Sequence, residues 1–173
     1  MARNWTLQFE PRAIDCNSPT VGASPSQLPT NLRPSITFDP AIDESAVLEG
    51  IIPSEHTGSG TLKLYLVYAA NTTTAADDVR WDVNGEVLTP NNNESTNVDS
   101  YGATADSTTG TFGTTAYALR SVTITLTNFK ADEVPAVGDK FRLKITRDAN
   151  NGSNLDDLAA DCHLVGAEVY EEV

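Results

Sequence analysis

The chain has 173 residues, of which 39% are hydrophobic and 20% charged, and this composition indicates one folded domain rather than a disordered segment. A formal net charge of −13 opposes binding to a phosphate backbone, which argues against a nucleic-acid partner and favours basic or mixed surfaces. No apolar run is long enough to span a membrane, and residues 1–10 lack the apolar segment of a signal peptide. We therefore expect no membrane partner and no secretion by the standard route.

Alternation of apolar and polar residues recurs along the chain and predicts β-strands. The pattern has period two and is rich in β-branched and aromatic residues, as is typical of strands with one buried face. In chain order it covers residues 5–9, 62–68, 79–83, 122–127, 141–146 and 164–170. Two further runs, 35–38 and 46–52, are strand-like but alternate less strictly. The one helical candidate, residues 155–160, is long enough for a single turn. About eight strands predict an all-β antiparallel sandwich, for which we favour a jelly roll, although the strand order cannot be read from the sequence.

The segment before the second strand is rich in proline and is expected to behave differently. Residues 11–34 contain five of the nine prolines: Pro11, Pro19, Pro25, Pro29 and Pro34. Proline removes backbone donors, so we expect an extended arm and no central strand. The arm could be a flexible linker, or it could lie on its own domain or on a neighbouring subunit. The sequence thus divides into residues 1–34, an N-terminal strand and arm, and residues 35–173, the sandwich.

Two turn-like stretches interrupt the later strands. Asn84-Gly85 follows an alternating run and predicts a type I′ hairpin turn, because both central residues of that turn need positive φ. Residues 91–115 are rich in Thr, Ser, Asn and Gly, and predict either a long surface excursion or a poorly apolar edge strand.

The residues that most often carry chemistry form no catalytic pattern in this sequence. His56 precedes a Gly-Ser-Gly stretch and is expected to be an exposed loop histidine. Cys162 and His163 are neighbours in a predicted strand, so their side chains should point to opposite faces and not act as a pair. Cys16 and Cys162 are expected to be free buried thiols, with a disulfide between them as the alternative. We expect no enzyme activity and no cofactor.

An acidic stretch between residues 148 and 161 raises the possibility of a calcium site, since hard cations bind several oxygens. The order of its residues does not match an EF-hand loop, so we expect a solvated turn and no metal. Trp5 and Trp81 stand at apolar strand positions and are expected in the core. The low aromatic content, 7%, shows no evident sugar-stacking platform.

Several motifs resemble uncharacterised structural proteins of tailed bacteriophages. Residues 78–82 read Asp-Val-Arg-Trp-Asp, and residues 138–149 contain Phe-Arg-Leu-Lys followed by Arg-Asp-Ala. Residues 35–47 match as a strand with Phe-Asp and an acidic turn, and residues 50–53 match in their Gly and Pro. Residues 58–70 match as a Gly-rich turn followed by a strand, and residues 164–169 match as the closing strand. This resemblance implies a virion structural protein.

Within that class our hypothesis is a capsid decoration or cement protein on the capsid surface of the virion, trimeric and bound to the major capsid protein. An acidic sandwich with an extended arm suits such a role, because many weak copies gain avidity on a symmetric lattice. The alternatives are a tail, neck or fibre component, and a carbohydrate-binding module for adsorption. The expected partner contacts are Trp5, Phe9, Pro11, Pro19, Pro25, Pro29, Tyr101, Phe112 and Tyr117.

Overall fold

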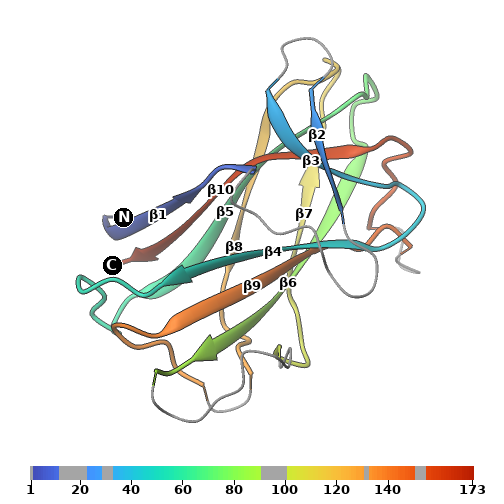
Figure 1. Ribbon diagram of the computed structural model, residues 1–173. Coiled ribbons are helices and arrows are strands. Elements are labelled where there is room, and N and C mark those ends of the chain that lie inside the picture. The colour runs from blue at the N-terminus through green and yellow to red at the C-terminus, as the bar shows by residue number, and fades with distance from the viewer. Residues whose placement is uncertain (1, 12–22, 29–32, 91–100, 131–132, 151–154) are drawn as a thin grey trace.

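The computed structural model describes residues 2–11, 23–28, 33–90, 101–130, 133–150 and 155–173. Within them, ten strands form two antiparallel sheets that pack face to face (Figure 1). The predicted all-β sandwich is therefore confirmed. Among the described residues there is no helix with the length and apolar character needed to cross a lipid bilayer.

The first sheet is organised around its longest strand, β10. In order across the sheet the strands are β2 (Ser24–Gln27), β3 (Pro34–Phe38), β10 (Cys162–Glu172), β5 (Thr61–Ala70) and β8 (Arg120–Thr125). β1 (Arg3–Phe9) also pairs with β10, along residues 167–172, whereas β3 pairs with residues 162–164. Because β5 pairs with both parts of β10, β1 and β3 share the opposite edge of that strand.

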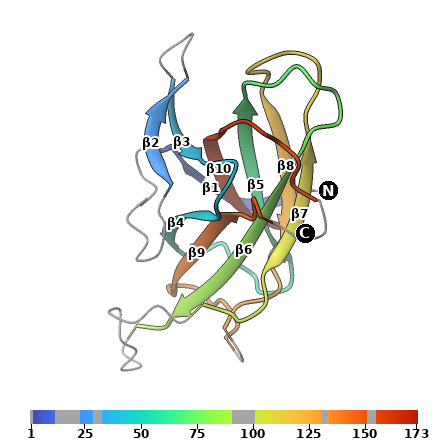
Figure 2. The same ribbon diagram turned by 90° about the vertical axis from the view of Figure 1, so that its right-hand side faces the viewer.

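The second sheet has the order β4 (Glu44–Ile51), β9 (Lys140–Arg147), β6 (Asp78–Leu88) and β7 (Asp106–Thr111). Figure 2 shows β2 and β3 at one margin of the molecule and β7 and β8 at the other. Side chains from alternate strand positions fill the space between the two sheets.

The core confirms the faces that alternation predicted. Leu64, Leu66 and Tyr68 of β5 are buried, and Trp81 of β6 is fully buried against them. The Phe38 ring meets the Trp81 ring edge-on, with centroids 5.2 Å apart. Such an arrangement places the positive ring edge against the negative ring face and adds to the burial of apolar area.

Two local predictions are wrong. Asn84 and Gly85 form no hairpin turn: they lie inside β6, opposite Lys144 and Leu143 of β9. The glycine is needed for close packing, because a Cβ at position 85 would lie 2.5 Å from the Phe129 ring. Residues 155–160 form no helical turn either.

The Pro-rich segment is in part a strand of the first sheet. β2 pairs with β3, and its Pro25 stands on an edge strand, where the lost backbone donor costs no ladder bond. Ala23 and Leu28 flank this strand and are buried. Residues 12–22 and 29–32, the rest of the arm, lie outside the described residues.

The segment 91–115 contains an edge strand, as one of the two alternatives predicted. β7 is the last strand of the second sheet and pairs only with β6 among the described residues. β2 and β7 are the two strands beyond the predicted eight, and alternation missed both because neither carries a run of large apolar residues.

The two most specific motifs of the phage-like resemblance lie on neighbouring strands. Arg80 from the first motif forms ion pairs with Asp82, at 3.1 Å, and with Asp148 from the second, at 3.3 Å. Both motifs therefore contribute to the contact that β6 makes with β9 and with the loop after β9. Their charged residues have a structural role that requires no ligand.

Candidate functional site

A pocket of about 310 Å³ opens at the end of the sandwich where both chain termini lie, at the left of Figure 1. It is formed by the loop between β4 and β5, the start of β5, and the segment that follows β8. The termini are held side by side there by a hydrogen bond from the Val173 amide to the Ala2 carbonyl, at 3.1 Å. The volume is at the small end of the range for small-molecule sites.

The floor and one wall of the pocket are apolar and fixed. Leu62 and Leu126 are buried, and the Leu126 amide donates to the Leu62 carbonyl at 2.9 Å. Phe129 forms a parallel bridge with Gly85, and its ring packs where a side chain at position 85 would otherwise be. The Phe129 ring is therefore a half-buried aromatic surface held by the sheet edge.

The polar groups of the pocket are also held in place. The Glu133 carboxylate accepts a hydrogen bond from the Val87 amide, at 2.8 Å, and lies 3.3 Å from the Lys130 ammonium. The Thr127 hydroxyl donates to Asp106 at 2.6 Å, so towards a ligand its oxygen is an acceptor. These side chains are ordered before any ligand arrives, which lowers the entropy cost of binding.

His56 lines the pocket and is not the exposed loop residue that the sequence predicted. Its side chain is only 5% exposed, because it is enclosed by the Trp5 ring, which meets it edge-on with centroids 6.0 Å apart. Nε2 lies 3.1 Å from the Pro135 carbonyl and must therefore donate to it. Nδ1 lies 3.3 Å from a carboxylate oxygen of Glu171.

Glu171 is fully buried and accepts several hydrogen bonds. Its donors include the Asn4 amide group at 2.7 Å, the Thr57 hydroxyl at 2.8 Å and the Gly60 backbone amide at 3.2 Å. Burial alone would raise the pKa of Glu171, but the hydrogen bonds from Asn4, Thr57 and Gly60 outweigh it and lower the pKa to about 2. The carboxylate thus stays charged and ties the loop between β4 and β5 to β10.

The described residues among the expected partner contacts differ in their exposure. Trp5 and Phe112 are 7% and 6% exposed, which leaves their side chains little surface for a partner. Phe9 packs edge-on against Phe141 with centroids 6.3 Å apart, and Pro11 is buried. Pro25 is exposed on β2.

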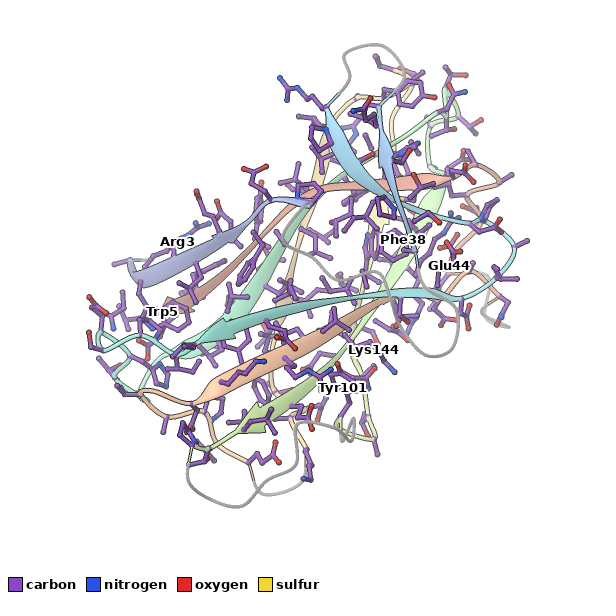
Figure 3. All side chains as sticks on the ribbon, viewed as in Figure 1. Arg3, Trp5, Phe38, Glu44, Tyr101 and Lys144 are labelled. Carbon is purple, nitrogen blue, oxygen red and sulfur yellow. The ribbon has the colours of Figure 1, made fainter. Side chains whose placement is uncertain are left out.

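Pro19 and Pro29 lie outside the described residues. Tyr101 lies over the second sheet near Arg142 and Lys144 of β9, whose charged groups are 5.4 and 5.3 Å from its ring centroid (Figure 3). Tyr117, with a left-handed φ of 57°, lies with its ring 6.0 Å from that of His163. The partner contacts stay predictions.

Cys162 and His163 point to opposite faces, as predicted. Cys162 is a free thiol in the core, and burial raises its pKa. His163 faces the hydroxyls of Ser35 and Thr37, at 3.4 and 3.2 Å, and burial lowers its pKa. Neither group forms a nucleophile and base pair with the other. Cys16 lies outside the described residues.

The guanidinium of Arg147 binds the described part of the acidic stretch through hydrogen bonds. Arg147 is fully buried and makes two hydrogen bonds to Asp156, at 3.0 and 2.8 Å. It also donates to the carbonyls of Leu158, at 2.6 Å, and Ala160, at 2.9 Å. Within the described residues, no group of three or more His, Cys, Asp or Glu side chains is placed to hold a metal ion.

The comparisons with known proteins assign no family and no function to the chain. No family model matches the chain, and no curated protein matches it. Among solved structures it is similar to the carbohydrate-binding module CBM36 in complex with calcium and xylotriose, with 13% identity, a TM-score of 0.45, and coverage of 94% of this chain and 98% of that one. A family 35 carbohydrate-binding module from an environmental isolate matches with 12% identity, a TM-score of 0.49, and coverage of 94% and 91%.

Another solved structure that matches is a protein of a different kind. The insecticidal delta-endotoxin Cry8Ea1 of Bacillus thuringiensis matches with 13% identity and a TM-score of 0.41, over 88% of this chain and 23% of that one. Likeness at this level assigns no ligand, because one fold hosts unrelated functions. The function has to be argued from the pocket itself.

The pocket was not predicted from the sequence. Thr61, Phe129 and Glu133 line it, yet they come from segments about 70 residues apart in the chain. Phe129 follows the alternating run 122–127 inside a polar stretch, and this isolated aromatic residue was the only local signal.

Proposed function

We propose that the protein is a non-catalytic carbohydrate-binding module and that the pocket beside Phe129 takes the sugar. The observation that carries this proposal is the combination of a fixed aromatic ring with ordered polar groups in one small pocket. A sugar ring presents apolar C–H faces and polar hydroxyl edges, so it needs both kinds of surface at once.

The polar groups support binding rather than catalysis. Glu133 is the only carboxylate that lines the pocket among the described residues, and it already bonds Val87 and Lys130. Glycoside hydrolysis by the common mechanisms uses two carboxyl groups that flank the scissile bond. Glu171 does not supply the second one, since it is fully buried and held by hydrogen bonds from its own chain.

Two matched pairs of variants test the proposal. Phe129→Leu removes the aromatic face but keeps an apolar packing group, and Phe9→Leu makes the same change in a half-buried ring away from the pocket. Thr61→Ala removes a hydroxyl at the rim, and Thr123→Ala removes an exposed hydroxyl on β8.

Affinity electrophoresis against a panel of soluble polysaccharides gives the measurement. We expect at least one polysaccharide to retard the native protein, with retardation weakened about tenfold or more by F129L and less by T61A, while both controls behave as the native protein. The absence of retardation by every polysaccharide, or equal losses in F129L and F9L, would refute the proposal.

A second candidate is a virion structural protein, as the phage-like motifs suggest: a trimeric capsid decoration protein bound to the major capsid protein. The observation in its favour is a set of exposed apolar side chains near the pocket, where Ile51 is 63%, Val134 78% and Val137 53% exposed. Large apolar groups exposed together are typical of protein interfaces. The copy number in purified particles tests this: about one copy per capsid subunit supports it, whereas absence from particles rejects it.

A further inference from the structure

We infer that the pocket selects neutral saccharides and rejects those that carry carboxylates, with Glu133 as the specificity-determining residue. This inference rests on the proposed function, because it concerns the class of sugar that the same pocket would bind. It is argued from the hydrogen-bonding capacity and the charge of the groups that line the pocket.

The first step is the hydrogen-bonding character of the pocket. The Thr127 hydroxyl proton is given to Asp106, which leaves that oxygen to accept. The Glu133 carboxylate accepts from the Val87 amide through one oxygen and has lone pairs left. Both groups therefore need a ligand that donates, and the hydroxyls of a neutral sugar can do so, whereas an ionised carboxylate brings only acceptors.

The second step is charge. Glu133 lines the pocket, and the Lys130 ammonium, on a side chain 41% exposed, lies 3.3 Å from its carboxylate. His56 also lines the pocket, but its two ring nitrogens face the Pro135 carbonyl and the Glu171 carboxylate rather than a ligand. A ligand carboxylate would thus meet the Glu133 carboxylate, whose charge the exposed Lys130 offsets only in part, on a protein whose net charge is −13.

The size of the effect follows from Coulomb's law. Two like charges about 6 Å apart in a half-exposed site, with an effective dielectric constant of about 40, disfavour binding by a factor of about ten. The Lys130 ammonium beside Glu133 reduces this factor, and the loss of the hydrogen bonds that the acceptors would make adds to it. We therefore expect neutral sugars to bind at least tenfold more tightly than their carboxylated counterparts.

The experiment compares each polysaccharide that binds with the same polymer after oxidation of its C6 hydroxyls to carboxylates. The proteins are the native chain, Glu133→Gln and Glu49→Gln. Glutamine at position 133 keeps a carbonyl that can accept from the Val87 amide. Glu49, on the outer face of β4 and paired with Lys140 and Arg142, is a matched control that makes the same change in net charge away from the pocket.

The expected result is a neutral-to-oxidised affinity ratio of at least ten, which E133Q reduces by about tenfold and E49Q leaves within twofold. Equal or tighter binding of the oxidised polymers overturns the inference and leaves the proposed function standing. A ratio that E133Q does not change overturns the role of Glu133. Failure of every neutral polymer to bind rejects the proposed function itself, and the inference with it.

Discussion

The two ends of β10 hold buried titratable groups in opposite ways. At its start, His163 lies among the neutral hydroxyls of Ser35 and Thr37, and burial lowers its pKa, which favours the uncharged ring. At its other end, Glu171 is more deeply buried, yet its pKa falls to about 2 because donors from several segments converge on it. Burial alone does not decide whether a titratable group is charged, because hydrogen bonds to its charged form can outweigh the cost of burial.

The two ends of the sandwich also differ in structure. The Glu171 end carries a pocket whose walls are held by polar contacts, whereas the His163 end is held by Arg147 and its buried partners close to the core. If the charged groups at each end are as important as their hydrogen bonds indicate, their removal should destabilise the fold.

The largest effect is expected at the end near His163. Asp156→Ala leaves the buried Arg147 guanidinium without its carboxylate, and we expect the free energy of unfolding to fall by about 3–5 kcal/mol. Urea denaturation measures it. Asp161→Ala, which removes an exposed carboxylate nearby, serves as control and should change stability by less than about 0.5 kcal/mol. Similar losses in both variants would contradict the role of the Arg147 contact.

A smaller effect is expected for Glu171→Gln, which loses charge-assisted hydrogen bonds worth about 2 kcal/mol at pH 7. Because the native pKa is about 2 and the ordinary value is 4.5, the native carboxylate stabilises the fold fully above about pH 4.5. That contribution is lost as the pH falls from 4.5 towards 2.

Unfolding curves in urea at several pH values measure this contribution. The native protein should lose stability across that window, and E171Q should lose less. Glu172→Gln, the neighbouring substitution, should keep the native pH dependence. A pH profile of E171Q that parallels the native one would show that Glu171 does not set the acid sensitivity.

Gly85→Ala tests the packing of Phe129 at the pocket end of the sandwich. The added Cβ would lie 2.5 Å from the Phe129 ring, so the ring must move, and we expect a loss of about 1–2 kcal/mol together with weaker saccharide binding. Gly166→Ala is the control, since its Cβ would meet nothing closer than 3.8 Å. Thermal unfolding measures the stability, and affinity electrophoresis measures the binding. Unchanged binding in a destabilised G85A would show that Phe129 does not contribute to the saccharide site.

The smallest effect concerns His163. Its pKa is lowered in the folded chain, so the unfolded chain binds the proton more readily, and stability should decline as the pH falls below about 6.5. His163→Gln should flatten the stability profile just below pH 6.5 and leave the steeper decline below pH 4.5 unchanged. Unfolding curves between pH 5 and 7.5 test it, and an unaltered slope in H163Q would contradict it.

Much of the fold could be predicted from local pattern, but little of the pocket could. Alternation in residues 62–68 identified the buried face of β5 because each strand residue reports its own face. The prediction from turn-forming residues failed at Asn84-Gly85, where an Asn-Gly pair typical of a turn is kept inside β6 by pairing with β9 and by the Phe129 ring. His56 was mistaken for an exposed residue because its neighbours in sequence are exposed, whereas Trp5 and Glu171, which enclose it, are distant in the chain.

The sequence by itself determined the all-β class, the core faces of most strands, the burial of Trp5 and Trp81, and the opposite orientations of Cys162 and His163. These properties follow from the two-residue repeat of a strand and need only local information. The tertiary structure alone decided the strand order, the charge state of Glu171 and the existence of the pocket. Each of these depends on contacts between segments that only the packing of the two sheets brings together.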